Sequence, residues 1–279
     1  MARRALLAFA ALCVGLVVAV YVVAFDSARG AGWDSYAIGA ATAERNIPRI
    51  HAASARLIET IDIGSLVLLG GGLVVVGVFI RRWRAAIGAL LVVAGANATT
   101  QVLKPSLGAA APFGDPRAEL QSSFPSGHAT VAMSLALAAV LVAPPSWKLF
   151  VALGGAAYAA AIGISLLIQA SHYPSDVAGG YLITGAWAGA VGALFGLDRS
   201  TRSGSARQGL IAAGVMAAGF AVAVAVTVHR HPGIVLRVHL ETKLVFIVGV
   251  LAALALAVAI GLALLLQAIA WRSASTTRS

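Results

Sequence analysis

Charged residues are scarce in this sequence: Lys, Arg, Asp and Glu make up 11% of the 279 residues, whereas hydrophobic residues make up 60%. About a quarter of the residues of a soluble globular domain are charged, so the composition excludes that class. The mean hydropathy of +0.92 agrees. The sequence therefore predicts an all-α fold, a polytopic membrane helix bundle.

Cysteine is almost absent as well. Cys13 is the only one, and it lies inside an apolar run. A single cysteine excludes a disulfide within the chain and metal sites built on cysteine. The sequence also lacks a dense ligand motif such as His-Glu-x-x-His, which disfavours a metal site built on its histidines.

Long apolar runs take up most of the chain. A helix needs roughly 20 residues to cross about 30 Å of hydrocarbon, and eight runs meet this need. The predicted spans are Ala5–Phe25, Ile63–Ile80, Ala85–Leu103, Ser126–Val142, Leu149–Ala170, Val177–Leu197, Gly209–Val228 and Leu244–Trp271.

The first span and the polar stretch behind it set the organisation of the N-terminal region. The first run is longer than the core of a signal peptide, about 7–15 residues, so we expect it to stay uncleaved, with cleavage near Ala28 as the alternative. Residues 26–62 are polar and contain Pro48, which predicts an external loop with a short surface helix. We expect three regions, 1–84, 85–197 and 198–279.

The cations indicate how the spans are oriented. Eight spans put both termini on one side, and that side receives eleven Lys and Arg residues in short loops with one acid, Asp198. Dense Lys and Arg in short loops mark the cytoplasm, so we predict cytoplasmic termini. Anionic lipid head groups explain the net charge of +10, and no nucleic-acid partner is needed. The Ala-rich, Lys-poor composition is typical of a high-GC bacterium, which predicts a bacterial plasma membrane.

Three polar islands interrupt the apolar runs: residues 104–112, 124–130 and 171–176. Ionisable residues beside membrane spans are costly and indicate a working site. The predicted topology, which was derived without the islands, places all three on the outer face. We therefore expect them to form one phosphate-handling site.

The second island has the features of an anion site. Phe124-Pro-Ser-Gly-His128 stands where a loop becomes a helix, and the free N–H groups and dipole of a first helical turn attract anions. Ser126 can cap the helix or donate a hydroxyl, Gly127 lets a phosphate approach the backbone, and His128 projects from the first turn. Taken alone, the same residues are explained by a helix cap with an interfacial histidine.

The other two islands supply a histidine–carboxylate pair and a cation. Pro174 suits the opening of a helix, and Asp176, four residues after His172, can reach the ring N–H and leave the other ring nitrogen free to react. Lys104 closes the third span and can place a point charge on a phosphate. Taken alone, these residues are explained by a surface pair and by a lysine that extends to the interface.

In these residues the sequence resembles the type 2 phosphatidic acid phosphatase superfamily of membrane lipid phosphatases, which is related to the vanadium haloperoxidases. The resemblance covers about a hundred residues, from Val102 to about Leu197, within spans three to six. The family's three-part signature matches at Lys104 and Pro112, at Pro125, Ser126, Gly127 and His128, and at Ser165, His172 and Asp176.

The resemblance implies hydrolysis of a phosphomonoester or diphosphate without a metal or other cofactor. His172 would be the nucleophile that forms a phosphohistidine, supported by Asp176. His128 would protonate the leaving oxygen. Lys104, Ser126 and the Gly127 N–H would hold the phosphate, since a ring of cations and donors normally meets the charge of a phosphoryl transition state.

Two arginines of the signature are missing: Ala111 and Leu166 stand in their places. Neither residue can imitate the bidentate fork of a guanidinium, and each lost contact is worth about 3–4 kcal/mol on the scale of oxyanion donors. Arg117, in the same loop as Lys104, is the first candidate substitute. Further candidates are Arg230, Arg237 and Lys243, and for each of these cations, Arg117 included, a solvated loop charge is the favoured explanation.

Two functions of different classes follow. The first is a lipid phosphatase with its site on the extracytoplasmic face, whose substrate is a polyprenyl diphosphate or a phospholipid phosphate. The second is a non-catalytic membrane protein that binds or presents a lipid phosphate. The missing arginines favour the second function, and the intact His128, His172 and Asp176 favour the first. Oligomeric state is not specified by any pattern in the sequence.

Overall fold

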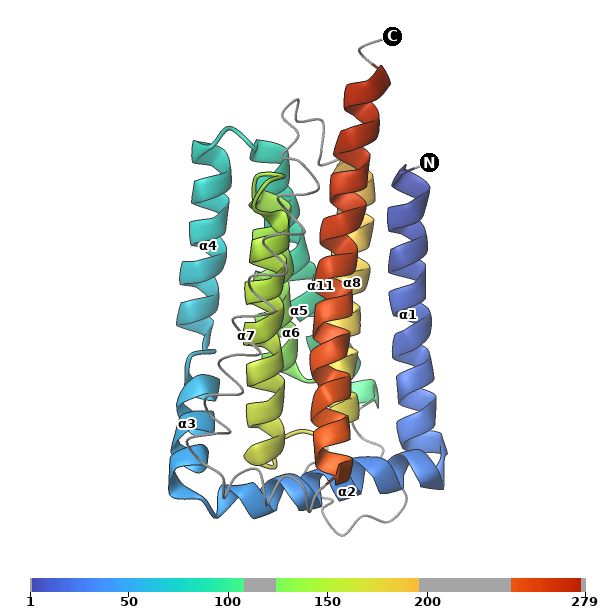
Figure 1. The fold of residues 1–279 in the computed structure, drawn as a ribbon, viewed down its shortest axis with the longest axis vertical. Helices are drawn as coiled ribbons and strands as arrows, with labels where there is room; N and C mark the ends of the chain where they lie inside the picture. Colours follow the sequence, from blue (N-terminus) through green and yellow to red (C-terminus); the bar gives the residue numbers. More distant parts are fainter. Residues whose placement is uncertain (1, 108–123, 196–241, 277–279) are drawn as a thin grey trace.

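A computed structural model of the chain describes residues 2–107, 124–195 and 242–276, and these residues form a bundle of helices without strands. Most helices stand side by side, whereas α2 lies across one end of the bundle (Figure 1). The helices are α1 (Ala2–Asp26), α2 (Ala28–Arg45), α3 (Pro48–Glu59), α4 (Ile63–Phe79), α5 (Trp83–Leu107), α6 (Gly127–Val142), α7 (Lys148–Ile168), α8 (Pro174–Phe195) and α11 (Thr242–Thr276). The predicted all-α class is confirmed.

Five of the described helices are long and apolar enough to cross a membrane: α1, α5, α7, α8 and α11. Helices α3 and α4, which bend by 59° at a short break, would together supply a sixth span, and α6 is a shorter apolar helix. Spans one to six and span eight of the prediction correspond to α1, α4, α5, α6, α7, α8 and α11. The predicted seventh span, Gly209–Val228, lies outside the described residues.

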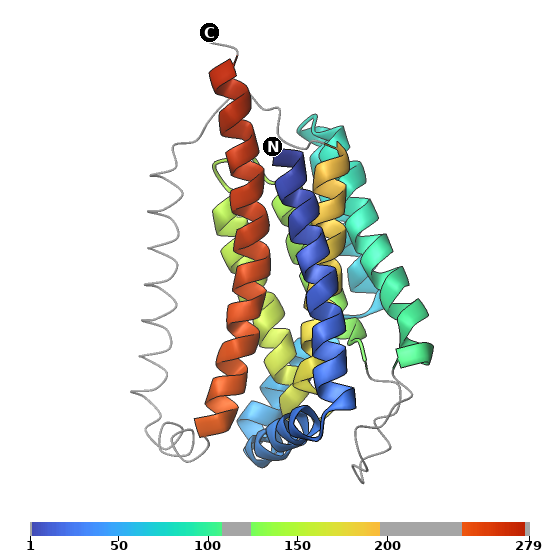
Figure 2. The same ribbon diagram turned by 90° about the vertical axis from the view of Figure 1, so that its right-hand side faces the viewer.

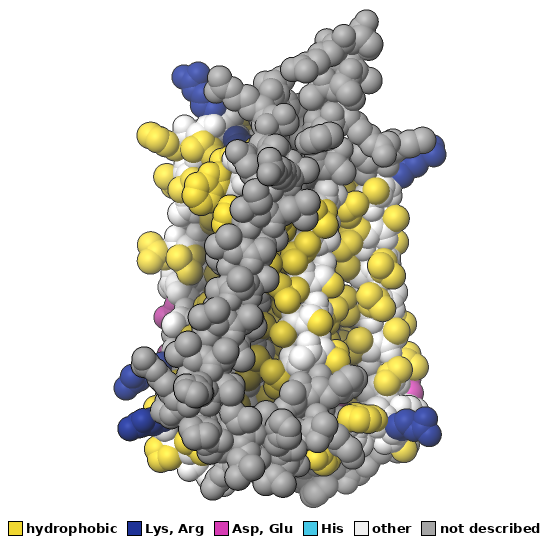
Figure 3. Space-filling view, in the orientation of Figure 1, with side chains coloured by type: hydrophobic (Ala, Val, Ile, Leu, Met, Phe, Trp, Pro, Cys, Tyr) yellow, Lys and Arg dark blue, Asp and Glu magenta, His cyan; other side chains and the backbone are white. Residues whose placement is uncertain are grey.

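The surface of the described residues matches a multi-pass membrane protein. Large hydrophobic side chains on α1, α4 and α5 are exposed, among them Leu12, Leu68 and Leu90. Figure 3 shows hydrophobic side chains along the flank of the bundle and Lys and Arg side chains near its two ends. This separation suits a hydrocarbon layer between two polar interfaces.

The direction of the helices brings the three polar islands to one end. Helix α1 begins and α11 ends at the same end of the bundle, and α2 lies at the opposite end (Figures 1 and 2). The C-terminus of α5 and the N-termini of α6 and α8 all lie toward the α2 end (Figure 2). Lys104, Ser126 and His172, from the three islands, therefore lie toward the end of the bundle that α2 covers.

The stretch between the first two predicted spans contains two helices rather than the single short surface helix that we expected. Helix α2 buries Ala37, Ile38 and Ala41 against the bundle. Helix α3 is fixed to the C-terminal end of α7, because the Gln169 amide donates to the carbonyl of His51 (3.0 Å). These buried contacts, rather than local propensity, keep both helices against the bundle.

Two cations that the sequence places in short loops are bound to the C-terminal end of α6. Lys148 is fully buried, and its Nζ donates to the carbonyl of Val140 (2.8 Å). Arg82 Nη1 donates to the carbonyl of Val142 (2.9 Å). The last carbonyls of a helix have no partner within the helix, and a cation there also interacts favourably with the negative end of the helix dipole. Both side chains therefore stabilise the end of α6.

One hydrophobic core runs through the described helices. It includes side chains of α1 and of α11 as well as of α5 to α8, so it crosses the boundaries of the three regions expected from the sequence. A Cβ on Gly185 would lie 2.9 Å from Cys13 Sγ, and one on Gly189 would lie 3.0 Å from the carbonyl of Leu6. These glycines of α8 permit close approach of α1, as small residues do in membrane bundles.

Candidate functional site

The start of α6 offers an open helix N-terminus. Ser126 is the N-cap, and its Oγ accepts a hydrogen bond from the Ala129 N–H (3.3 Å). Gly127 is the first residue of the helix. Among the described atoms, the nearest to a Cβ on Gly127 is Gln101 Nε2, at 3.9 Å. There is room at this position for an anion to approach the backbone N–H groups.

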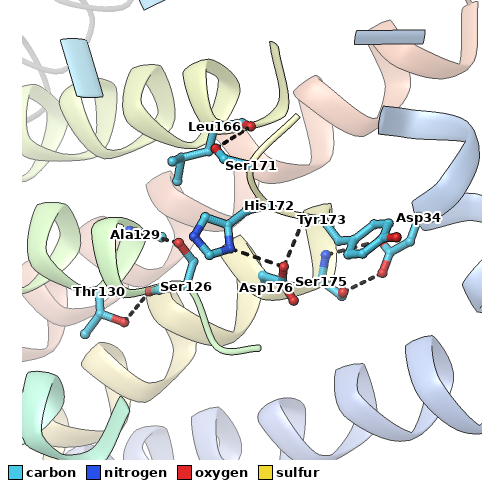
Figure 4. Close-up of polar contacts among 10 residues, drawn as sticks. All are labelled: Asp34, Ser126, Ala129, Thr130, Leu166, Ser171, His172, Tyr173, Ser175 and Asp176. Atoms are coloured by element: carbon cyan, nitrogen blue, oxygen red, sulfur yellow. Dashed lines mark hydrogen bonds and ion pairs between the residues drawn. The ribbon is translucent and has the colours of Figure 1, made fainter. Parts of the chain in front are cut away.

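The start of α8 holds the histidine–carboxylate pair. Helix α8 opens at Pro174, and Asp176 follows in its first turn. Asp176 Oδ2 accepts from the Tyr173 N–H (2.9 Å) and lies 3.3 Å from His172 Nδ1 (Figure 4). The contact assigns the ring proton to Nδ1, so that Nε2 carries the free lone pair.

The two helix starts are joined directly. The Ser126 N–H donates to the carbonyl of Asp176 (3.0 Å), and a Cβ on Gly180 would lie 2.9 Å from the carbonyl of Ser126. The ring of His172 lies between Asp176 and Ser126 (Figure 4). The ring of His128 follows closely, with its centroid 6.4 Å from that of His172. Two histidines and a helix N-terminus therefore surround one small volume.

The end of α5 brings Lys104 to the same place. Lys104 is half-buried in the last turn of α5, and its charge interacts with the ring of His128. Buried hydroxyls hold α5 to α6, since Thr100 Oγ1 lies 3.0 Å from Thr130 Oγ1. The structure thus brings together six of the predicted site residues: Lys104, Ser126, Gly127, His128, His172 and Asp176.

The structure describes one of the two positions at which an arginine of the signature is missing. Leu166 is buried in the hydrophobic core, and its carbonyl accepts from the Ser171 hydroxyl (3.1 Å). Leu166 therefore supplies no positive charge to a phosphate at this position. The other position, Ala111, and the suggested substitutes Arg117, Arg230 and Arg237 lie outside the described residues, as does the side chain of Lys243.

Three polar residues near the site were not predicted. Asp34 of α2 is buried, and its carboxylate accepts from both the backbone N–H and the hydroxyl of Ser175. Gln101 precedes Lys104 by one helical turn and places its amide beside Gly127. Nothing in the sequence distinguishes Asp34 from the other charged residues of 26–62. No pattern along the chain connects it to Ser175, 141 residues away.

One carboxylate oxygen of the His172–Asp176 pair makes no hydrogen bond to the described residues. Asp176 Oδ1 is buried and has no hydrogen-bond partner among the described residues, although buried polar atoms normally have one. Within the described part of the chain, the carboxylate is therefore bound through Oδ2 alone. The arrangement offers a nucleophilic nitrogen on His172, a second imidazole that can exchange a proton, and N–H donors for an anion. These are the groups that phosphoryl transfer to a histidine requires.

Comparison with known proteins bears on this geometry. Neither the curated proteins nor the solved structures give a match. The model of the PAP2 superfamily matches residues 85–199, a segment that contains most of α5, all of α6 to α8 and all seven predicted site residues, six of which the structure describes. Over residues 85–199 the chain is therefore similar to the PAP2 superfamily, which is consistent with a member of the type 2 phosphatidic acid phosphatases.

Proposed function

We propose that the protein is a lipid phosphatase that needs no metal and works through a phosphohistidine on His172. The observation that carries the proposal is the short contact between His172 Nδ1 and Asp176 Oδ2, 3.3 Å, with the ring of His128 6.4 Å from that of His172. Members of the matched superfamily are phosphatases, and the nucleophile, its carboxylate and the acid stand in one place.

The reaction follows from the positions of these groups. His172 Nε2 attacks phosphorus, so that an N–P bond forms while the P–O bond to the leaving group breaks. His128 gives its proton to the leaving oxygen and then takes a proton from the water that hydrolyses the phosphohistidine. Asp176 stabilises the positive charge on the His172 ring. The Gly127 N–H, Ser126 and Lys104 meet the phosphoryl oxygens, and the Gln101 amide adds a donor beside Gly127.

The site's place in the fold supports a lipid substrate. The groups lie at one end of a bundle whose flank is apolar (Figure 3), so a lipid in the bilayer can present its head group there. We propose a polyprenyl diphosphate or a phospholipid phosphate as substrate, and an extracytoplasmic site in a bacterial plasma membrane with both termini cytoplasmic. Arg117 is proposed as a further cation for the phosphate.

Phosphate release in EDTA tests the proposed function. The detergent-purified protein is offered a polyprenyl diphosphate or phosphatidic acid, beside a preparation from cells that carry the empty vector. We expect release that survives EDTA from at least one lipid, because the site uses histidines in place of a metal. Release that requires an added divalent cation would contradict the mechanism.

A second candidate rests on Leu166. Its side chain is buried in the core where the signature has an arginine, which favours a protein that binds a lipid phosphate and leaves it intact. Folded protein that releases no phosphate from either lipid, yet binds vesicles containing phosphatidic acid more tightly than vesicles of phosphatidylcholine, would identify this function. Release of phosphate would exclude it.

His128→Ala separates the acid from the nucleophile. We expect the variant to slow the hydrolysis of phosphatidic acid by about 10²-fold or more, the usual worth of a general acid. The rate at which p-nitrophenyl phosphate phosphorylates His172 should fall far less, because nitrophenolate leaves without a proton. The rates of leaving-group release in the first turnover provide the measurement, since later turnovers also need His128 as the base for water.

His51→Ala is the matched control, since His51 is a half-buried histidine on α3 and should leave both rates unchanged. An equal loss on both substrates would contradict the acid role of His128.

A further inference from the structure

We propose that Asp34 is a positioning residue: through Ser175 it fixes the first turn of α8 and with it the His172–Asp176 pair. Asp34 lies in α2, outside the segment matched by the superfamily model. The inference rests on the proposed phosphatase function, which it deepens by assigning a role to a helix that the matched segment does not contain.

The contact is direct and buried. Asp34 Oδ1 accepts from the Ser175 N–H at 3.2 Å, and Asp34 Oδ2 accepts from the Ser175 hydroxyl (Figure 4). Both side chains are at most 7% exposed, so water does not compete for these bonds. The N–H groups of a helix's first turn have no partner within the helix, and Asp34 supplies one from a distant part of the chain.

Ser175 stands between the two residues of the catalytic pair. It directly precedes Asp176 and follows His172 by three positions in the same short segment. Figure 4 shows Asp34 and Ser175 on one side of this turn and the His172 ring on the other. Any rotation of the turn about the axis of α8 would move His172 Nδ1 relative to Asp176 Oδ2, so the bonds from α2 hold the nucleophile in place.

The apolar surroundings of Asp34 favour its protonated form, so that Asp34 acts on α8 through hydrogen bonds. It lines an apolar cavity of about 410 Å³ together with Val20 and Val23 of α1, Trp33 of α2 and Leu251 of α11. Burial raises the pKa of Asp34 to about 7, Ser175 opposes the rise, and the nearby charge of Asp176 adds to it. Close to neutral pH the carboxyl group is therefore often protonated, and its hydrogen bonds rather than its charge act on α8.

Two variants of Asp34 separate the effect of its hydrogen bonds from the effect of its charge. Asp34→Asn keeps an oxygen to accept from the Ser175 N–H and an amide to bond its hydroxyl, whereas Asp34→Ala loses both. We expect Asp34→Ala to lower kcat about tenfold or more with KM nearly unchanged, since small misplacements of reacting groups are expensive in rate. Asp34→Asn should restore kcat to within about threefold of the wild type.

Matched controls separate positioning from loss of stability. Asp62→Ala removes a carboxylate that caps a different helix, α4, and should leave kcat unchanged. Ser175→Ala should add little to the loss in Asp34→Ala, because both changes break the same contact. Equal kcat for Asp34→Ala and the wild type, or equal losses for Asp34→Ala and Asp34→Asn, would overturn the proposal.

A second readout does not depend on activity. Diethyl pyrocarbonate modifies neutral histidines, and mass spectrometry gives the rate at His172, which is 7% exposed in the wild type. We expect faster modification of His172 in Asp34→Ala and a rate near that of the wild type in Asp34→Asn. If the wild type released no phosphate, this result would still support the positioning role, and unchanged modification in Asp34→Ala would overturn it.

Discussion

His172→Ala is expected to abolish both the release of phosphate and its capture on the protein. The His172 ring is held by Asp176 on one side and faces the start of α6 on the other (Figure 4), and an alanine leaves no nitrogen there to attack phosphorus. His128 cannot take over, because its ring centroid is 6.4 Å from that of His172 and it belongs to another helix. Loss of a nucleophile typically costs about 10⁶-fold in rate.

The measurement is a rapid quench with a lipid labelled in the phosphate. Phosphohistidine survives alkali and is lost in acid, so protein quenched in alkali should keep the label and protein quenched in acid should not. The wild type should show this pattern, and His51→Ala should match it. His172→Gly, which leaves a cavity, should regain some turnover when imidazole is added. Label that persists in His172→Ala would assign the nucleophile to another residue.

Local patterns in the sequence predict much of the bundle and of the site. The apolar runs place α1, α5, α7 and α8 to within a few residues, because a bilayer imposes one length on every span. Ser126 and Pro174 mark the helix starts at α6 and α8, since both residues have definite roles in a first turn. The spacing of His172 and Asp176 by four residues predicts their contact, which the structure shows at 3.3 Å.

The features that the sequence does not reveal all depend on contacts between distant segments. The bonds of Asp34 to Ser175 span 141 residues, and local propensity contains no trace of them. Lys148 looks like a loop cation, yet it is buried because the carbonyls at the end of α6 need donors. Helix α2 remains on the bundle through tertiary contacts, which no periodicity within Ala28–Arg45 encodes. The patterns in the sequence therefore predict which segments form helices, but not which distant segments pack against one another.

Asp176→Asn is expected to lower the rate by about 10²- to 10⁴-fold, as loss of the carboxylate does in a catalytic triad. In the wild type a single oxygen, Oδ2, faces both the Tyr173 N–H and His172 Nδ1. An asparagine oxygen in that place would keep both contacts but lose the charge that stabilises the cationic His172 ring. Its amide would then occupy the place of Oδ1, which is buried without a described partner.

The other orientation of the asparagine is worse for catalysis. The amide would point its own hydrogens at the Tyr173 N–H and force His172 to present a lone pair at Nδ1, which places the ring proton on the attacking nitrogen. Both orientations lower kcat and leave the phosphate donors of α6 in place, so KM should change little. Asp62→Asn, the same substitution at the N-cap of α4, is the matched control and should keep wild-type kinetics. Thiol labelling of buried Cys13 on heating reports whether each variant is folded. A folded Asp176→Asn protein with a rate within twofold of the wild type would show that His172 acts without its carboxylate.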